Sequence, residues 1–250
     1  MRIFRRTIER LSRNRVLKKH LPVDFARAPL LVSPDASLRF WKPGIQSDLF
    51  DYAREFVHSG SVVWDIGANV GLFAVAAAQR AGVSGQVVAM EADIWLAGLL
   101  HRTATMQPST SAPIQVIPAA AYSSMGVAAF NIARRGRASN FLAAATGSTQ
   151  TGGIRETVQV VAITLDWLLA QKRAPTVVKI DVEGAEAHVL RGGLRTIAEC
   201  RPIILCEVCE PACDEVTDLL SHCGYTLYDW DARPHTRVGR ACYNTLALPS

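Results

Sequence analysis

The sequence predicts an α/β fold in which one open, mostly parallel sheet carries helices on both faces. Three observations predict it. Strand-like and helix-like runs alternate over most of the chain, as units of strand, helix and strand require. The strand-like runs are strongly apolar, which is typical of parallel strands buried on both faces. The chain of 250 residues is long enough for one such domain with a full core.

The first half of the alternation contains three strands, at 62–66, 86–90 and 114–119, separated by helices at 70–80 and 94–106. The runs 127–132 and 157–163 are further strand candidates. Between them lies a segment rich in Gly, Ser, Thr and Arg, residues 133–156, which we name the excursion. Its composition is too polar for a core, so we expect a long loop over the surface.

The alternation resumes after the excursion. We expect helices at 165–171, 183–190 and 211–223, and strands at 176–180, 202–208, 225–230 and 244–248. About seven strands in one open sheet fit this count. We therefore expect one main domain at residues 41–250, preceded by a basic N-terminal extension at residues 1–40.

The basic charge of the chain is concentrated at its start. Residues 1–20 hold eight basic residues and one acid, a net charge of +7, so the other 230 residues together carry −2 of the total of +5. This pattern argues against a nucleic-acid-binding face on the domain. Phe4, Ile8 and Leu11 fall at helical spacing within this basic tail. Such a stripe can contact an anionic membrane or an acidic partner weakly, pack on its own domain, or remain solvated.

No apolar run is long enough for a membrane span, and the N-terminus lacks the apolar core of a signal peptide, so we expect a cytoplasmic protein. Five of the six cysteines fall between residues 200 and 223. Cys206, Cys209 and Cys213 have a spacing that faintly resembles a metal cluster, but no second ligand pair accompanies them. We expect reduced thiols and no bound metal.

An acid and two glycines follow the first strand, in the stretch VVWDIGANVG that starts at Val62. In an open α/β sheet, ligands bind beyond the carboxyl ends of the strands. A second acid ends the next strand, where a carboxylate can accept both hydroxyls of a ribose. The candidate cofactor-binding residues are Asp65, Gly67, Ala68, Asn69, Gly71, Glu91 and Ala92.

Two ligand classes fit a strand, a tight turn and a helix followed by an acid: dinucleotides and S-adenosylmethionine. The dinucleotide fingerprint has a glycine where this chain has Asn69, and Asp65 would repel a pyrophosphate. S-adenosylmethionine has no phosphate and carries an ammonium and a sulfonium, which a carboxylate attracts. The sequence therefore favours S-adenosylmethionine. The alternative is a glycine-containing turn in which Asp65 caps the helix.

A second polar motif, VVKIDVEGAEAHVLRGG, starts at Val177 and places Lys179, Asp181, Glu183 and Glu186 within eight residues. Lys179 and Asp181 have the same parity, so their side chains project from one face of the strand or its end. Glu183 is expected to begin the next helix, where the dipole favours an anion. The alternative is a salt-bridged strand end followed by a capped helix.

With these motifs the sequence resembles the FkbM-type methyltransferase family. DIGANVG resembles the cofactor loop of that family, and VKIDVEGAEAHVLRG resembles its most distinctive signature. ITLDWLL, RPIILCEV and AAYSSMGVAAFNI also match in place, so the resemblance runs from about residue 44 to residue 248. One departure is the turn at residues 122–124, which lacks the acid that often contacts adenine there.

The resemblance implies a class I methyltransferase fold, with seven strands in the order 3-2-1-4-5-7-6 and strand 7 antiparallel. It also implies O-methylation of a hydroxyl on a small molecule, sugar or glycan. An alcohol is a poor nucleophile while it is protonated, so a base is useful, and Asp181 and Glu183 are the catalytic candidates by position. Glu207 is a third acid on the same rim, and His235 is a weaker candidate.

Two other functions stay open at this point: a catalytically inactive S-adenosylmethionine-binding accessory protein, and a dehydrogenase, against which Asn69 counts. Arg134, Arg135 and Arg137 suggest that the excursion is a mobile flap over the acceptor site, with a solvated loop as the alternative. The sequence does not indicate an oligomeric state or a particular acceptor.

Overall fold

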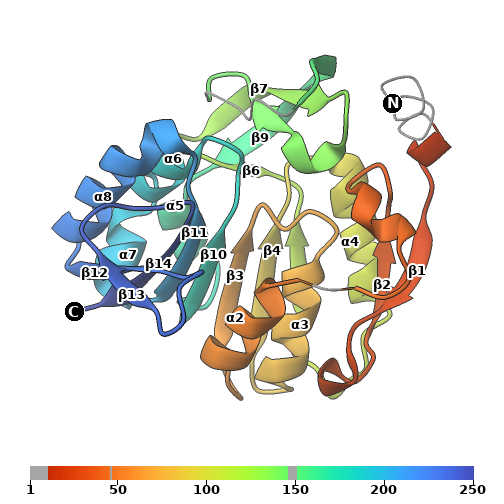
Figure 1. Cartoon of the computed structure of the whole chain (residues 1–250), viewed down its shortest axis with the longest axis horizontal. Coiled ribbons are helices and arrows are strands. Elements are labelled where there is room, and N and C mark those ends of the chain that lie inside the picture. The colour runs from red at the N-terminus through yellow and green to blue at the C-terminus, as the bar shows by residue number, and fades with distance from the viewer. Residues whose placement is uncertain (1–10, 46, 146–150) are drawn as a thin grey trace.

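The computed structural model describes residues 11–45, 47–145 and 151–250. Its centre is an eight-stranded sheet with the strand order β13-β12-β14-β11-β10-β3-β4-β5 (Figure 1). From one edge to the other, these strands are β13 (Thr236–Val238), β12 (Tyr225–Asp229), β14 (Asn244–Pro249), β11 (Ile203–Glu207), β10 (Val177–Ile180), β3 (Val62–Ile66), β4 (Gln86–Met90) and β5 (Ile114–Ile117).

The mostly parallel sheet confirms the predicted fold class. Read from β5, the first seven strands follow the implied order 3-2-1-4-5-7-6, and β14 runs antiparallel to both of its neighbours. The expected count of seven strands is wrong, because β13 adds an eighth at the edge, antiparallel to β12. This strand is three residues long and largely exposed, so it has no apolar run that sequence reasoning detects.

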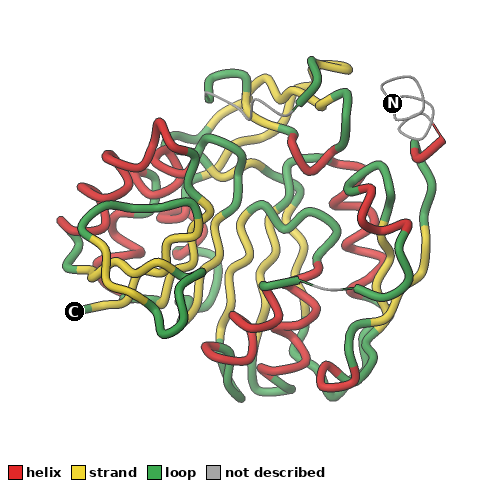
Figure 2. Tube along the Cα trace, viewed as in Figure 1, coloured by secondary structure: helices red, strands yellow, loops and turns green. Residues whose placement is uncertain are grey.

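Helices cover both faces of the sheet (Figure 2). Because successive strand residues point to opposite faces, Val63 packs with one group of helices and Trp64 packs with the other. The first group is α2 (Leu49–Phe56), α3 (Leu72–Ala81) and α4 (Ile94–Ala104). The second group is α5 (Leu165–Leu169), α6 (Glu186–Arg191), α7 (Leu194–Cys200) and α8 (Cys213–His222). Burial of every residue of β3 and β4 follows from this double cover.

The N-terminal segment packs on the first group of helices. The strands β1 (Leu17–His20) and β2 (Pro29–Val32) pair antiparallel around a 3₁₀ turn, η1 (Val23–Phe25). Phe25 and Leu30 are buried in the same core as α3 and α4. The division into residues 1–40 and 41–250 stays a prediction, but residues 21–36 share the core of the main sheet. Phe4 and Ile8, of the predicted basic stripe, lie outside the described residues.

The ends of the excursion and residues 141–142 belong to a second sheet, which corrects the expectation of a surface loop for those residues. The strand order is β6-β9-β7-β8, formed by β6 (Ala120–Ala121), β9 (Ile154–Ile163), β7 (Gly126–Ala133) and β8 (Phe141–Leu142). A short 3₁₀ turn, η3 (Arg137–Ser139), lies between β7 and β8. In Figure 1 this sheet lies beyond the ends of β4 and β10. Two further 3₁₀ turns, η2 (Leu38–Trp41) and η4 (Glu210–Ala212), precede α2 and α8.

Across the three described ranges, no helix has the length and apolar character that crossing a membrane requires. All six cysteines are free thiols, and none belongs to a group of potential metal ligands among the described residues.

Candidate functional site

The turn after β3 brings the two polar motifs together. Gly67 has φ +75°, and a Cβ placed on it would lie 1.8 Å from the carbonyl oxygen of Asp181. Gly71 has φ +86°, and its Cβ would lie 2.1 Å from Leu100 Cδ1 on α4. Glycine is therefore needed at both positions, for the backbone conformation and for close packing. Gly67 fixes how closely the end of β10 approaches the turn.

Lys179 links these motifs electrostatically. Its ammonium donates to the carbonyl oxygen of Gly67 at 3.0 Å and lies 3.1 Å from Asp181 Oδ2 and 3.4 Å from Asp65 Oδ1. Burial by itself would lower the pKa of Lys179, but the carboxylates of Asp181 and Asp65 outweigh burial and raise that pKa. Lys179 therefore stays charged inside the protein.

The structure changes the interpretation of Asp65. Its carboxylate is fully buried, and neither oxygen has a hydrogen-bond partner within the described parts of the chain. Burial raises the pKa of Asp65, and nearby Lys179 partly offsets that rise. Asp65 does not cap α3, whose N-cap is Gly71 without a side-chain hydrogen bond. The cation that Asp65 contacts is Lys179. Any influence of the Asp65 carboxylate on a bound cofactor is therefore a longer-range electrostatic one.

Glu91 organises the other side of the turn. Its two oxygens accept the backbone N–H groups of Asn69 at 2.7 Å and Asp93 at 2.8 Å. Asn69 adopts a left-handed conformation, with φ +53°, and its side-chain oxygen accepts the N–H of Val70. Burial raises the pKa of Glu91 to about 7. Each carboxylate oxygen keeps a second lone pair that is free to accept a further hydrogen bond.

An inner cavity of about 60 Å³ lies between the carboxyl ends of β3, β4 and β10 and the second sheet. Most of the predicted site residues line it: Gly67, Asn69, Glu91, Ala92, Asp181 and Glu183. Asp65, Ala68 and Gly71 do not line it. Asp65 and Ala68 are buried, and Gly71 is the N-cap of α3. The structure therefore brings the two predicted motifs to one cavity.

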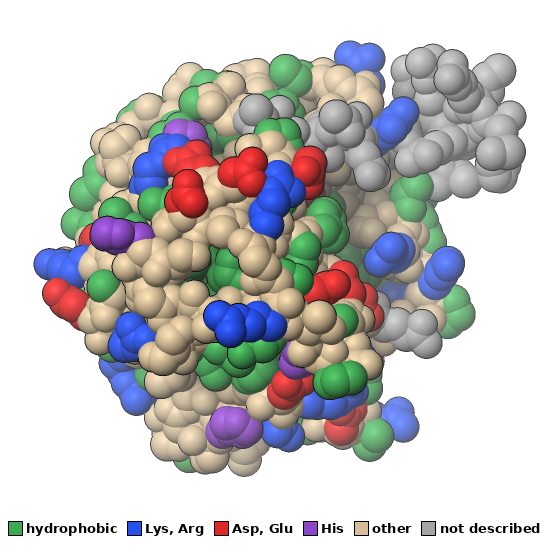
Figure 3. Space-filling model, turned by 60° about the vertical axis from the view of Figure 1, so that its left-hand side comes forward, with side chains coloured by type: hydrophobic (Ala, Val, Ile, Leu, Met, Phe, Trp, Pro, Cys, Tyr) green, Lys and Arg blue, Asp and Glu red, His purple; other side chains and the backbone are tan. Residues whose placement is uncertain are grey.

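An outer cavity of about 830 Å³ lies on the other side of Asp181. Its lining combines acids, Asp48, Asp181 and Glu207, with the cations Arg39, Lys42 and Lys179. Apolar side chains such as Leu49 and neutral polar ones such as Asn244 also line it. Figure 3 shows a hollowed face with hydrophobic side chains inside and acidic and basic side chains around them. Among the described residues, Asp181 is the single one that lines both cavities.

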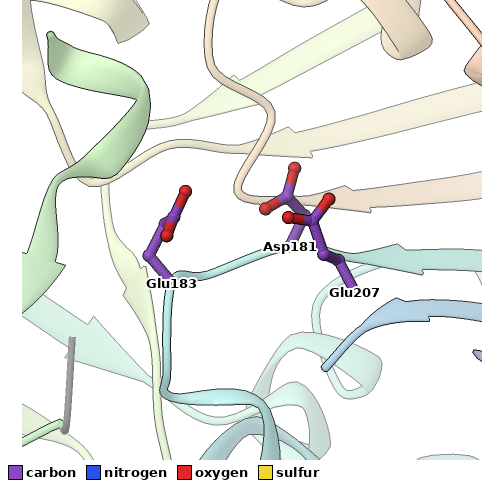
Figure 4. A group of neighbouring side chains, drawn as sticks. All are labelled: Asp181, Glu183 and Glu207. Atoms are coloured by element: carbon purple, nitrogen blue, oxygen red, sulfur yellow. The ribbon is translucent and has the colours of Figure 1, made fainter. Parts of the chain in front are cut away.

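Three carboxylates gather at this junction, as Figure 4 shows: Asp181 after β10, Glu183 on the following loop and Glu207 at the end of β11. Each offers an oxygen within 4.8 Å of the others. Burial and the neighbouring carboxylates raise the pKa of Glu183 to about 8 and that of Glu207 to about 7. The Tyr243 hydroxyl donates to Glu207. Three oxygens at this separation suit a divalent cation, and the expectation of no metal stays a prediction.

Two details differ from the sequence interpretation of this motif. Glu183 does not begin a helix, because α6 starts at Glu186, and Glu183 lies in the preceding turn with φ +52°. Glu186 is buried and accepts the N–H of Gly184 through one oxygen. His235 contacts Glu55 and stacks on Trp230, and it lines neither cavity.

Sequence reasoning missed the role of the excursion. Arg137, Ala138 and Asn140 line the inner cavity together with Glu91 and do not line the outer one, and the flap hypothesis stays a prediction. The run of arginines indicates that this segment has a polar role, but the partners of Arg137 are distant in sequence and could not be predicted. Arg137 pairs with Asp35 and Asp93 rather than extending into solvent.

Comparison with known proteins agrees with this geometry. The family model described as "Methyltransferase FkbM domain" matches residues 65–227. None of the curated proteins matches the sequence. A solved structure of methyltransferase FkbM from Methylobacillus flagellatus KT is similar, with a TM-score of 0.50 and 15% identity, over 80% of this chain and 50% of that chain. This chain therefore spans about half the length of that protein.

Two further solved structures are similar at lower scores. Precorrin-6y C5,15-methyltransferase from Geobacter metallireducens GS-15 gives a TM-score of 0.47 and 12% identity, over 80% of this chain and 87% of that one. Fibrillarin from Aeropyrum pernix, with natively bound S-adenosyl-L-methionine, gives 0.45 and 13%, over 77% of this chain and 68% of that one.

Proposed function

Because this chain belongs to the FkbM methyltransferase family, and is therefore an S-adenosylmethionine-dependent methyltransferase, we propose that it methylates a hydroxyl of a small molecule or of a sugar. The observation that carries the proposal is the position of Asp181. Its carboxylate lies where the inner cavity, which holds the family's cofactor-loop residues, meets the much larger outer cavity. A methyl donor on one side and an acceptor on the other would meet at this side chain.

The groups that line the inner cavity suit the nucleoside and the amino acid parts of S-adenosylmethionine, and the cavity of about 60 Å³ has to widen to hold them. Glu91 retains acceptor capacity for the ribose hydroxyls, and the tight turn at Gly67 and Asn69 leaves a side of the cavity without bulky side chains. The acids Asp181 and Glu183 lie nearby and favour the cationic centres of the cofactor. When bound, the cofactor supplies an electrophilic methyl group on a sulfonium.

The residues of this chain then activate the acceptor. Methyl transfer is an in-line displacement, so a hydroxyl oxygen must be held about 3 Å from the methyl carbon, opposite the sulfur. The oxygen forms a bond to the methyl carbon as the carbon–sulfur bond breaks, and S-adenosylhomocysteine leaves. The hydroxyl proton moves to a carboxylate. Asp181 is the first candidate, Glu183 at the inner cavity is the second, and Glu207, beside Tyr243, is the third.

The outer cavity is large enough for the acceptor. Its volume of about 830 Å³ lies within the range of roughly 300–1,000 Å³ that is usual for ligand sites. Apolar side chains beside acids and cations suit a hydroxylated molecule with an apolar body, or a sugar.

The test is methyl transfer from labelled S-adenosylmethionine to a panel of hydroxylated acceptors, with NMR of the product. We expect an O-methyl product from the native chain. Asp181→Asn should lose about 10²–10⁴ in turnover while it retains affinity for S-adenosylhomocysteine. Asp218→Asn is the matched control, since Asp218 is exposed on α8. Binding of S-adenosylhomocysteine without transfer to any acceptor would indicate an inactive cofactor-binding protein, and N- or C-methylation would contradict the hydroxyl acceptor.

A further inference from the structure

Arg137 is held rigidly at the wall of the inner cavity. Its side chain is 10% exposed, its Nε–H donates to Asp35 at 3.0 Å, and its Nη1–H donates to Asp93 at 2.5 Å. The guanidinium also lies over the ring of Trp95, 4.9 Å from its centroid. Arg137 lines the cavity together with Glu91 and Ala92. A guanidinium carries N–H groups on three nitrogens, and within the described residues Nη2 has no hydrogen-bond partner.

The residues that hold Arg137 form a balanced network. Asp35 also pairs with Arg155, at 2.7 Å and 3.0 Å, and Asp93 accepts from Asn140 Nδ2 at 2.8 Å. Two aspartates and two arginines leave no net charge. The free Nη2 group therefore suits a neutral acceptor, such as a purine nitrogen or a ribose oxygen, better than it suits another ion pair.

The turn after β6 does not supply this contact. The Tyr122 ring stacks on His188 with a centroid distance of 4.4 Å, and the Ser123 hydroxyl lies 3.3 Å from the same histidine. Neither Tyr122 nor Ser123 lines the inner cavity. Asn140 does line it, but its amide oxygen accepts the N–H of Ala133 and its Nδ2 donates to Asp93, which leaves one neutral N–H. Among the described residues, Arg137 is thus the cationic side chain that lines this cavity with a donor to spare.

We propose that Arg137 is a cofactor-binding residue that donates a hydrogen bond from Nη2 to the nucleoside part of S-adenosylmethionine, and that Asp35 and Asp93 position it. The inference rests on the methyltransferase function. It places two parts of the chain at the cofactor site that the family motifs do not contain: residues 137–140, and the N-terminal segment that carries Asp35, outside residues 65–227. Backbone hydrogen bonds from Arg137 and Ala138 to Asp35 and Ala36, at 2.8 Å and 3.1 Å, join these segments.

The test is calorimetric titration of Arg137→Gln with S-adenosylhomocysteine and, separately, with adenosine. Because no acceptor is present, the result does not depend on the proposed hydroxyl chemistry. We expect both ligands to bind roughly 10- to 100-fold more weakly, the loss of one hydrogen bond from a charged group. The matched control is Arg134→Gln, which removes an exposed arginine near Arg137 that does not line the cavity. Its affinities should stay within about threefold of the native chain.

Three results would overturn the inference. Unchanged or tighter binding by Arg137→Gln would show that Arg137 only joins the segments that carry Asp35 and Asp93. An equal loss in Arg134→Gln would make the effect a general one of lost positive charge. A loss for S-adenosylhomocysteine with unchanged adenosine binding would place Arg137 at the amino acid end. If Arg137→Gln does not fold, Arg137→Lys retains the charge toward the two aspartates and should show the same loss, because the fixed guanidinium fork is gone. A native chain that binds no S-adenosylhomocysteine would refute the family function instead.

Discussion

Lys179 and Asp65 face each other across the parallel strands β10 and β3, as direct partners in the register of the sheet. The side chains are 6% and 0% exposed, and the ammonium lies 3.4 Å from the carboxylate. Lys179 also contacts Asp181 and the carbonyl of Gly67. One buried ammonium thus joins the turn after β3 to the acids after β10, so the geometry of the two cavities depends on it.

Lys179→Met should destabilise the fold by about 3–5 kcal/mol at pH 8, because it leaves the buried Asp65 carboxylate without its partner. The loss should be smaller at pH 5. The pKa of Asp65 is already raised in the folded state, and without Lys179 it rises further, so protonation at low pH relieves the unpaired charge. Urea unfolding at both pH values measures this.

A double variant and a surface control complete this experiment. Lys179→Met combined with Asp65→Asn should recover part of the lost stability, since the buried charge is gone. Lys18→Met on the exposed side of β1 should change stability by less than about 0.5 kcal/mol. Equal stability of Lys179→Met and Lys18→Met would contradict the pairing.

The sequence identified the parts of the fold that depend on local patterns. Apolar runs located the central strands, and the acids at the ends of β4 and β10 were placed correctly at one edge of the sheet. Contacts between residues that are far apart in the sequence could not be predicted from it. Arg137 and Asp35 are 102 residues apart, and no periodicity indicates that they pair. The exposed β13 strand and the pairing of β7 with β9 depend likewise on partners that one sequence does not reveal.

Gly67→Ala should impair the site more than it strains the backbone. The positive φ costs about 1–3 kcal/mol, and the Cβ would collide with the Asp181 carbonyl, which adds about 1–3 kcal/mol and displaces Asp181. Gly82→Ala is the control, since Gly82 has φ +63° but a Cβ added there would meet nothing within 4 Å. Unfolding and methyl transfer are measured for both. Similar losses in the two variants would show that close approach to Asp181 is unimportant.

Cofactor binding should strengthen as pH rises through about 7. Burial raises the pKa of Glu91 to about 7 in the unliganded protein, so this side chain is protonated below that pH and loses acceptor capacity for the ribose hydroxyls. The affinity for S-adenosylhomocysteine, titrated from pH 5.5 to 8, should fall by up to about tenfold per pH unit below the pKa. Glu91→Gln should bind about 1.5–3 kcal/mol more weakly and with little pH dependence.

A control separates Glu91 from Glu183, another acid of the inner cavity. Glu183 has its pKa raised to about 8, so it titrates at higher pH. In Glu183→Gln, the affinity for S-adenosylhomocysteine should still change with pH near pH 7. An affinity in the native chain that is flat from pH 5.5 to 8 would refute the ribose role of Glu91.

Turnover should also rise with pH, because the candidate bases must be unprotonated to accept the hydroxyl proton. The raised pKa values of Glu183, about 8, and Glu207, about 7, place this rise between about pH 6 and 9. Glu183→Gln and Glu207→Gln are compared by single-turnover rates at saturating cofactor. The variant that loses both about 10²-fold or more in rate and the pH-dependent rise identifies the base. If both variants keep the rise, Asp181 is the remaining candidate.

The basic tail gives the last prediction, that it attaches the protein weakly to an anionic surface. Residues 1–20 carry a net charge of +7, and each basic residue near an anionic membrane contributes about 1 kcal/mol. The full chain should therefore sediment with anionic vesicles at low salt and dissociate at physiological salt. Vesicles of neutral lipid are the control for charge. Truncation should stop before β1 at Leu17, because β1 pairs with β2 and Leu21 is buried in the core. A chain that starts at Leu11 should keep its methyl transfer and bind vesicles less, since four basic residues are lost. A full chain that stays in the supernatant with anionic vesicles at low salt would end the membrane proposal.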